Sequence, residues 1–137
     1  MHGRSAYARS PDMTDTPLVP GAWSPDTIQW QDIAADGSRY ALLDGDKAAG
    51  IFSYAFFLPA GLWDPPHWHS QDSRVFVASG ILQLGYGNVF DRSALRAFPA
   101  GSFLTVPANA RHFDGADVDT LIYGVARGPW ATRYIGR

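Results

Sequence analysis

Short segments rich in β-branched and aromatic residues recur along this chain, and glycine, proline and aspartate turns separate them. Typical turns are Asp44-Gly45-Asp46, Pro59-Ala60-Gly61 and Pro99-Ala100-Gly101. No window keeps the i, i+3, i+4 apolar pattern of an amphipathic helix for more than about two turns. The spacing therefore predicts one all-β domain, an antiparallel sandwich or barrel. The predicted strands are 28–33, 39–43, 51–58, 74–78, 81–86, 102–106, 120–125 and 132–135.

The composition suits a single well-packed core. Of the 137 residues, 46% are hydrophobic and 14% aromatic, which excludes global disorder. The formal net charge is −2 with no block of like charges, so neither a nucleic-acid surface nor a membrane anchor is indicated. We expect a small-molecule substrate as the partner. A homodimer is also expected, because small β domains expose edge strands that a second subunit can cover.

Cysteine content, the length of apolar runs and the N-terminal residues together predict a cytoplasmic protein. The chain has no cysteine, which excludes disulfides, thiolate metal sites and a cysteine nucleophile. No apolar run approaches the roughly 20 residues of a membrane helix, and the first twenty residues lack the apolar segment of a secretory signal. Proline-containing residues 1–20 predict a flexible N-terminal arm and leave 21–137 as the folded domain. Met13 could be the natural start, and His2 falls in the arm, away from any site.

Three of the four histidines form a pattern that indicates a metal site. His67 and His69 are separated by one residue, and His112 follows Pro107 by five. Side chains at i and i+2 of a β-strand project from the same face, so His67 and His69 can bind one ion. His112 would complete the set of ligands. Imidazole is the commonest protein ligand for mid-to-late first-row transition metals. The pattern predicts a divalent ion held by His67, His69 and His112.

The residues around these histidines resemble the two sequence motifs of the cupin family. The first motif, G-x5-H-x-H-x3/4-E-x6-G, is matched by Gly61, His67, His69 and Gly80. The second, G-x5-P-x-G-x2-H-x3-N, is matched by Gly101, Pro107 and His112. The resemblance implies a small single-domain cupin, an antiparallel double-sheet jelly-roll barrel with the three histidines as metal ligands.

Three positions depart from the motifs. Ser73 stands where the first motif has glutamate, Asn109 replaces a glycine, and Ala116 replaces the terminal asparagine. Asn109 can adopt the left-handed backbone that such a turn needs. Only Ser73 changes the metal site itself. Three neutral imidazoles leave a divalent ion its full charge, which strengthens it as a Lewis acid and favours anionic bidentate substrates.

A three-histidine site without the carboxylate is similar to that of cupin oxygenases such as acetylacetone-type β-diketone dioxygenases and thiol dioxygenases. The resemblance implies a mononuclear Fe(II) dioxygenase that acts on a small diketone-like or phenolic substrate. One alternative is a non-redox lyase, isomerase or cyclase that uses Zn(II), Mn(II) or Ni(II). A further alternative is a small-molecule-binding cupin without turnover.

No catalytic residue beyond the ligands stands out in the sequence. Ser73, Gln71 and Asp72 are candidates to support the metal from the missing-glutamate segment, although Ser73 could simply fill space around a water. Tyr54 or Phe56 could line a cavity. The charged residues Arg74, Asp114 and Arg127 could orient an anionic substrate, but assignment to the solvated surface is preferred. The three histidines could instead be structural, but buried imidazoles without partners are costly, which favours metal binding.

Overall fold

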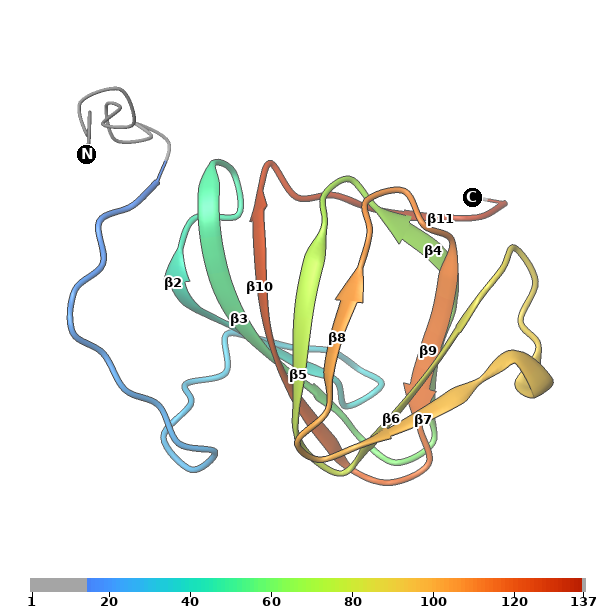
Figure 1. Cartoon of the computed structure of the whole chain (residues 1–137). Coiled ribbons are helices and arrows are strands. Elements are labelled where there is room, and N and C mark those ends of the chain that lie inside the picture. The colour runs from blue at the N-terminus through green and yellow to red at the C-terminus, as the bar shows by residue number, and fades with distance from the viewer. Residues whose placement is uncertain (1–14, 137) are drawn as a thin grey trace, which may run out of the picture.

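The computed structural model describes residues 15–136, which form two antiparallel β-sheets that face each other (Figure 1). The all-β double-sheet prediction is confirmed. Within residues 15–136 the only helical segment is the single 3₁₀ turn η1, Arg92–Ala94. The six-stranded sheet has the order β1 (Asp32–Ile33), β2 (Arg39–Gly45), β3 (Gly50–Leu58), β10 (Thr120–Gly128), β5 (Ser73–Ser79) and β8 (Phe103–Val106). The five-stranded sheet has the order β11 (Thr132–Tyr134), β4 (Leu62–His69), β9 (His112–Ala116), β6 (Ile81–Tyr86) and β7 (Arg96–Pro99).

The list of predicted strands needs correction at four places. Strands β4, β7 and β9 are missing from that list, because proline interrupts or ends the first two and the third contains Asp114-Gly115. Strand β4 was anticipated only in that His67 and His69 were placed on one strand. Of the predicted strand 28–33, only Asp32–Ile33 pairs with a neighbour. The preceding residues follow the outside of the sheet instead.

The core lies between the two sheets and follows the period-two alternation of the strands. On β5, Ser73, Val75 and Val77 are buried while Arg74 and Phe76 are exposed. The inward residues of the two sheets meet in one apolar cluster. Its buried members are Leu58, Val75, Val77, Leu82, Leu84, Leu104, Val106, Ala116 and Ile122.

A second, smaller cluster covers part of the outer face of the six-stranded sheet. Ile28 from the segment before β1 is buried against Ala41, Ala55 and Leu121. The predicted N-terminal arm, residues 1–20 with His2 and Met13, lies mostly outside the described residues. Among the described residues, no helix has the length and hydropathy that crossing a membrane would require.

Candidate metal centre

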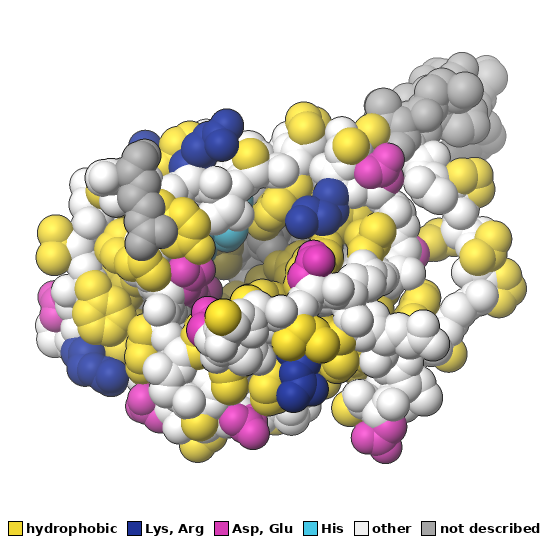
Figure 2. Space-filling model, turned by 180° about the vertical axis from the view of Figure 1, so that it is seen from behind, with side chains coloured by type: hydrophobic (Ala, Val, Ile, Leu, Met, Phe, Trp, Pro, Cys, Tyr) yellow, Lys and Arg dark blue, Asp and Glu magenta, His cyan; other side chains and the backbone are white. Residues whose placement is uncertain are grey.

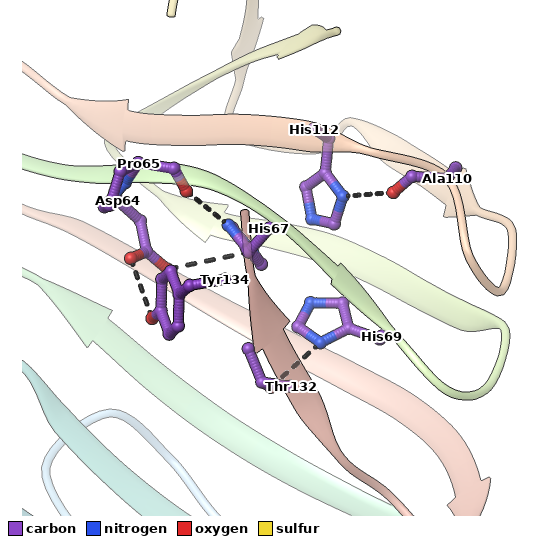
Figure 3. A network of polar contacts seen from close by, with 8 residues as sticks. All are labelled: Asp64, Pro65, His67, His69, Ala110, His112, Thr132 and Tyr134. Carbon is purple, nitrogen blue, oxygen red and sulfur yellow. Dashed lines mark hydrogen bonds and ion pairs between the residues drawn. The ribbon is translucent and has the colours of Figure 1, made fainter. Parts of the chain in front are cut away.

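The three histidines of the predicted site lie together on two neighbouring strands. His67 and His69 project from β4 and His112 from β9, and His67 is the direct partner of His112 across the two strands. One ligand nitrogen from each imidazole falls within 4.8 Å of the others, so the group could hold a metal ion (Figure 3). His67 and His112 are each only 2% exposed.

A β-bulge in β4 changes which side chains of this strand face the site. Between the pairs Asp64–Asp114 and His67–His112, β4 has one more residue than β9. The extra residue falls at Pro65-Pro66, where proline cannot donate to the ladder. On a regular strand, residues three apart face opposite sides, so Asp64 and His67 would point apart. The bulge turns both toward the interior.

Each imidazole is oriented by a hydrogen bond at Nδ1. His67 donates to the carbonyl oxygen of Pro65 at 2.8 Å, and His112 donates to that of Ala110 at 2.9 Å. The Nδ1 atom of His69 lies 3.0 Å from the hydroxyl of Thr132. A carbonyl can only accept, so His67 and His112 carry their proton on Nδ1 and leave Nε2 free for coordination. This is the arrangement that metal-binding histidines require.

The electrostatic environment keeps two of the imidazoles neutral. The pKa of His69 is lowered to about 3, mainly by burial and then by His112 and His67. The pKa of His112 is lowered to about 4, mainly by burial, while its hydrogen bond to Ala110 acts in the opposite direction. Neutral imidazole is the form that binds a metal. Protons therefore compete little for these two ligands near neutral pH.

Two carboxyl groups lie beside the histidines and were missed as site residues. Asp64 Oδ2 is 3.7 Å from Nε2 of His67, and Asp64, His67 and Asp114 form a second group that could hold a metal. The assignment of Asp114 to the solvated surface was wrong, because it faces the interior from β9. Its pKa is raised to about 7, mainly by burial and further by Asp64, while His67 acts in the opposite direction.

The candidates at the missing-glutamate segment have different positions. Ser73 is buried and its Oγ lies 3.2 Å from the phenol oxygen of Tyr54. Gln71 donates to the carbonyl of Pro129, and the Asp72 carboxylate accepts from the backbone N–H of Ala108. Neither Gln71 nor Asp72 lines the cavity beside the histidines. Of the three, Ser73 alone faces the interior of the barrel.

A cavity of about 250 Å³ opens beside the histidines. As the sequence suggested, Tyr54 and Phe56 both line it. Figure 2 shows this side of the molecule as a hollow with histidine surface inside it and apolar and acidic side chains around it. Its lining also includes Ser38, Leu58, Leu62, Trp63 and Ile122.

The C-terminal segment supports the site from one side. Strand β11 pairs with β4, and Thr132 is the direct partner of His69. Trp130 stacks on the ring of His69 with 4.5 Å between centroids, and Tyr134 donates to Oδ1 of Asp64 at 2.9 Å. These contacts join segments more than sixty residues apart in the chain. No local sequence signal could have predicted them.

The fold is shared with solved structures. An RmlC-like cupin from Shewanella frigidimarina is 13% identical, with a TM-score of 0.63, over 84% of this chain and 94% of that chain. The chain has the cupin fold. The polyketide cyclase RemF from Streptomyces resistomycificus is 16% identical, with a TM-score of 0.66, over 87% of each chain. A putative acetylacetone dioxygenase from Methylibium petroleiphilum is 21% identical, with a TM-score of 0.62, over 84% of this chain and 82% of that chain.

At these identities the similarity concerns the cupin fold alone. No protein-family model matches the sequence, and no curated protein matches it either. The two-sheet topology and the similarity to solved cupins confirm the double-sheet jelly roll that the two motifs predicted. The backbone of Asn109 has a φ of 68°, so this residue takes the left-handed turn at the motif's glycine position.

Proposed function

We propose that this cupin is a metal-dependent enzyme, and specifically a mononuclear Fe(II) dioxygenase acting on a small diketone-like or phenolic molecule. The observation that carries the proposal is the convergence of three imidazoles whose Nδ1 atoms are hydrogen-bonded, with Ser73 at the glutamate position. A three-nitrogen facial set leaves coordination positions for a bidentate substrate and a second small ligand.

The ion would be held by His67, His69 and His112, and it would supply Lewis acidity and, if it is iron, the capacity to activate O₂. The protein's own residues orient the substrate and exclude water. The aromatic side chains of Tyr54, Phe56 and Trp130 line the cavity. Asp114, buried within it, can exchange a hydrogen bond or a proton with a hydroxyl group of the substrate.

A non-redox reaction is the second candidate, and the two carboxyl groups favour it. Asp64 and Asp114 lie on the same side of the cavity as His67, where they could move a proton during a lyase, isomerase or cyclase reaction. This chemistry needs a metal that polarises a carbonyl but no electron transfer, which suits Zn(II), Mn(II) or Ni(II). The polyketide cyclase RemF shares the fold.

The experiment that tests the proposal begins with metal content. Protein purified without added metal is reconstituted anaerobically with Fe(II), Mn(II), Ni(II) or Zn(II), and bound metal is measured by mass spectrometry. We expect about one ion per chain. O₂ consumption is then followed with a panel of diketones and phenols. Uptake with Fe(II) alone supports the dioxygenase, whereas turnover with Zn(II) and no O₂ uptake supports the non-redox reaction.

Two outcomes would overturn the proposal. Negligible metal after all four reconstitutions would remove the metal-dependent enzyme altogether. Full metal occupancy with tight ligand binding and no product under any metal would instead favour a binding protein without turnover. The metal measurement is repeated with His112→Gln, which keeps roughly the size and polarity of the side chain but lacks the imidazole. This variant should bind less metal than the unmodified protein.

A further inference from the structure

The charged residues of the cavity all have the same sign. Asp36, Asp64 and Asp114 contribute to its lining, and none of the described lining residues is Lys or Arg. Figure 2 shows Lys or Arg side chains on the surface around the hollow. Lys47 is not among the lining residues, and its Nζ lies 4.5 Å from the centroid of the Tyr40 ring. The described lining therefore offers hydrogen-bond acceptors, and it offers a negatively charged ligand no cationic side chain.

One of these carboxyl groups, that of Asp64, is fixed in direction and lies opposite a second, that of Asp114. Asp64 and Asp114 are direct partners on β4 and β9. The hydroxyl of Tyr134 holds one oxygen of Asp64, and the other oxygen faces His67 (Figure 3). His67 belongs to both groups, with His69 and His112 on one side and the carboxyls on the other. The site thus has a nitrogen end for the metal and an oxygen end that accepts hydrogen bonds.

Much of the remaining wall is aromatic. Five aromatic residues line the cavity: Tyr54, Phe56, Trp63, Trp130 and Tyr134. Its volume is about 250 Å³, and a buried apolar cavity of about 150 Å³ suffices for benzene. A planar molecule of one or two rings fits both the volume and the aromatic walls.

We propose that this site, if it works as the metal enzyme proposed above, selects uncharged hydroxylated aromatic molecules. One hydroxyl oxygen faces the three histidines, the neighbouring hydroxyl donates to Asp64 or Asp114, and carboxylates of the same shape are rejected. A carboxylate ligand would have to lose its hydration beside two carboxyl groups, and it has no hydrogen to donate to them. A ring hydroxyl makes the hydrogen bond that the oxygen end accepts.

The test uses two probes of nearly equal size, naphthalene-2,3-diol and 3-hydroxy-2-naphthoate. Both offer two adjacent oxygen donors to a metal, but only the naphthoate is charged at neutral pH. Binding to Zn(II)-loaded protein is measured by tryptophan fluorescence and calorimetry, so that no turnover intervenes. We expect the diol to bind at least about tenfold more tightly. Asp114→Asn and Asp64→Asn should each shrink that ratio, because each removes a carboxyl group from beside the ligand and replaces it with an amide that can donate a hydrogen bond to the naphthoate.

Asp117→Asn is the matched control. Asp117 is exposed and accepts a hydrogen bond from Gln83 outside the cavity, so the variant loses one negative charge without altering the lining. It should leave the ratio of affinities unchanged. Equal or tighter binding of the naphthoate to the unmodified protein would overturn the inference. So would an unchanged ratio in both Asp64→Asn and Asp114→Asn.

The same pair of probes separates this inference from the metal proposal. In metal-free protein the aspartates alone act on the ligand, so the preference for the diol should persist. If the protein retains no metal and still prefers the diol, the metal enzyme fails and the selectivity stands. If metal binds fully and the naphthoate is preferred, the selectivity fails and the metal enzyme stands.

Discussion

The phenol oxygen of Tyr54 lies 3.2 Å from Oγ of Ser73, so two hydrogen-bonded hydroxyls stand at the place of the cupin motif's glutamate. The ring of Tyr54 reaches Ser73 by crossing β10 at Gly124, where any Cβ would collide with it. Burial raises the pKa of the Tyr54 phenol, which therefore keeps its proton near neutral pH. The space that a glutamate side chain would occupy is therefore filled by the packed side chains of Ser73 and Tyr54.

Ser73→Glu should destabilise the metal-free protein and tighten metal binding. The longer side chain must displace Tyr54 from a closely packed interior, which costs about 1–3 kcal/mol. Its carboxylate would face a divalent ion and strengthen binding. Urea unfolding measures the first effect and chelator competition the second. Ser73→Ala, which loses only the hydrogen bond, should cost about 1 kcal/mol. Unchanged metal affinity in Ser73→Glu would mean that position 73 does not face the ion.

Gly124→Ala should destabilise the protein by about 1–3 kcal/mol, because the new methyl group meets the ring of Tyr54. Removing that ring should relieve the clash, so the same substitution should cost less in a Tyr54→Ala background. A double-mutant cycle from urea unfolding measures the coupling. Additive effects of the two substitutions would contradict this packing.

His112→Ala should reduce bound metal from about one ion per chain to a small fraction, because His112 supplies one of only three imidazoles. The substitution also removes a buried side chain, so loss of folding must be distinguished from loss of the ligand. His112→Gln addresses this by keeping most of the volume. Both variants are compared by metal analysis and circular dichroism. A folded His112→Gln protein with full metal content would show that the ion, if present, is held elsewhere.

Thr132→Val should weaken metal binding by about tenfold while changing the shape of the site little. The Thr132 hydroxyl is the hydrogen-bond partner of His69 Nδ1, and loss of such a supporting contact typically costs 10- to 100-fold in affinity. Competition with a fluorescent chelator measures the change. Thr105→Val, the same substitution at an exposed position on β8, should have no effect. Equal affinities in the two variants would argue against an orienting role for Thr132.

The histidine triad could be predicted because its information is local. His67 and His69 lie two residues apart on one strand and so share a face, and the motif spacing links them to His112. Asp114 could have been found in the same way, since it lies two residues after His112 on the same face of β9. It was missed because β9 was not recognised as a strand.

The rest of the site depends on features that short-range patterns do not contain. Asp64 stands three residues before His67, and strand alternation alone would place the two on opposite faces. Only the bulge at Pro65-Pro66 reverses that expectation. Thr132 and Tyr134 reach the site through the pairing of β11 with β4, a register that no nearby residue specifies.

The homodimer and the cytoplasmic location stay predictions.

Strand β11 also sets an order of events during protein synthesis. The ribosome makes all three histidines before it makes Thr132 and Tyr134, and domains begin to fold while the chain is still growing. An ion captured at that stage would meet imidazoles that β11 does not yet orient. We therefore expect secure retention of an ion only after β11, the last of the described strands, has docked on β4. A chain ending at Ala131 should exchange its metal with a chelator faster than the full chain does.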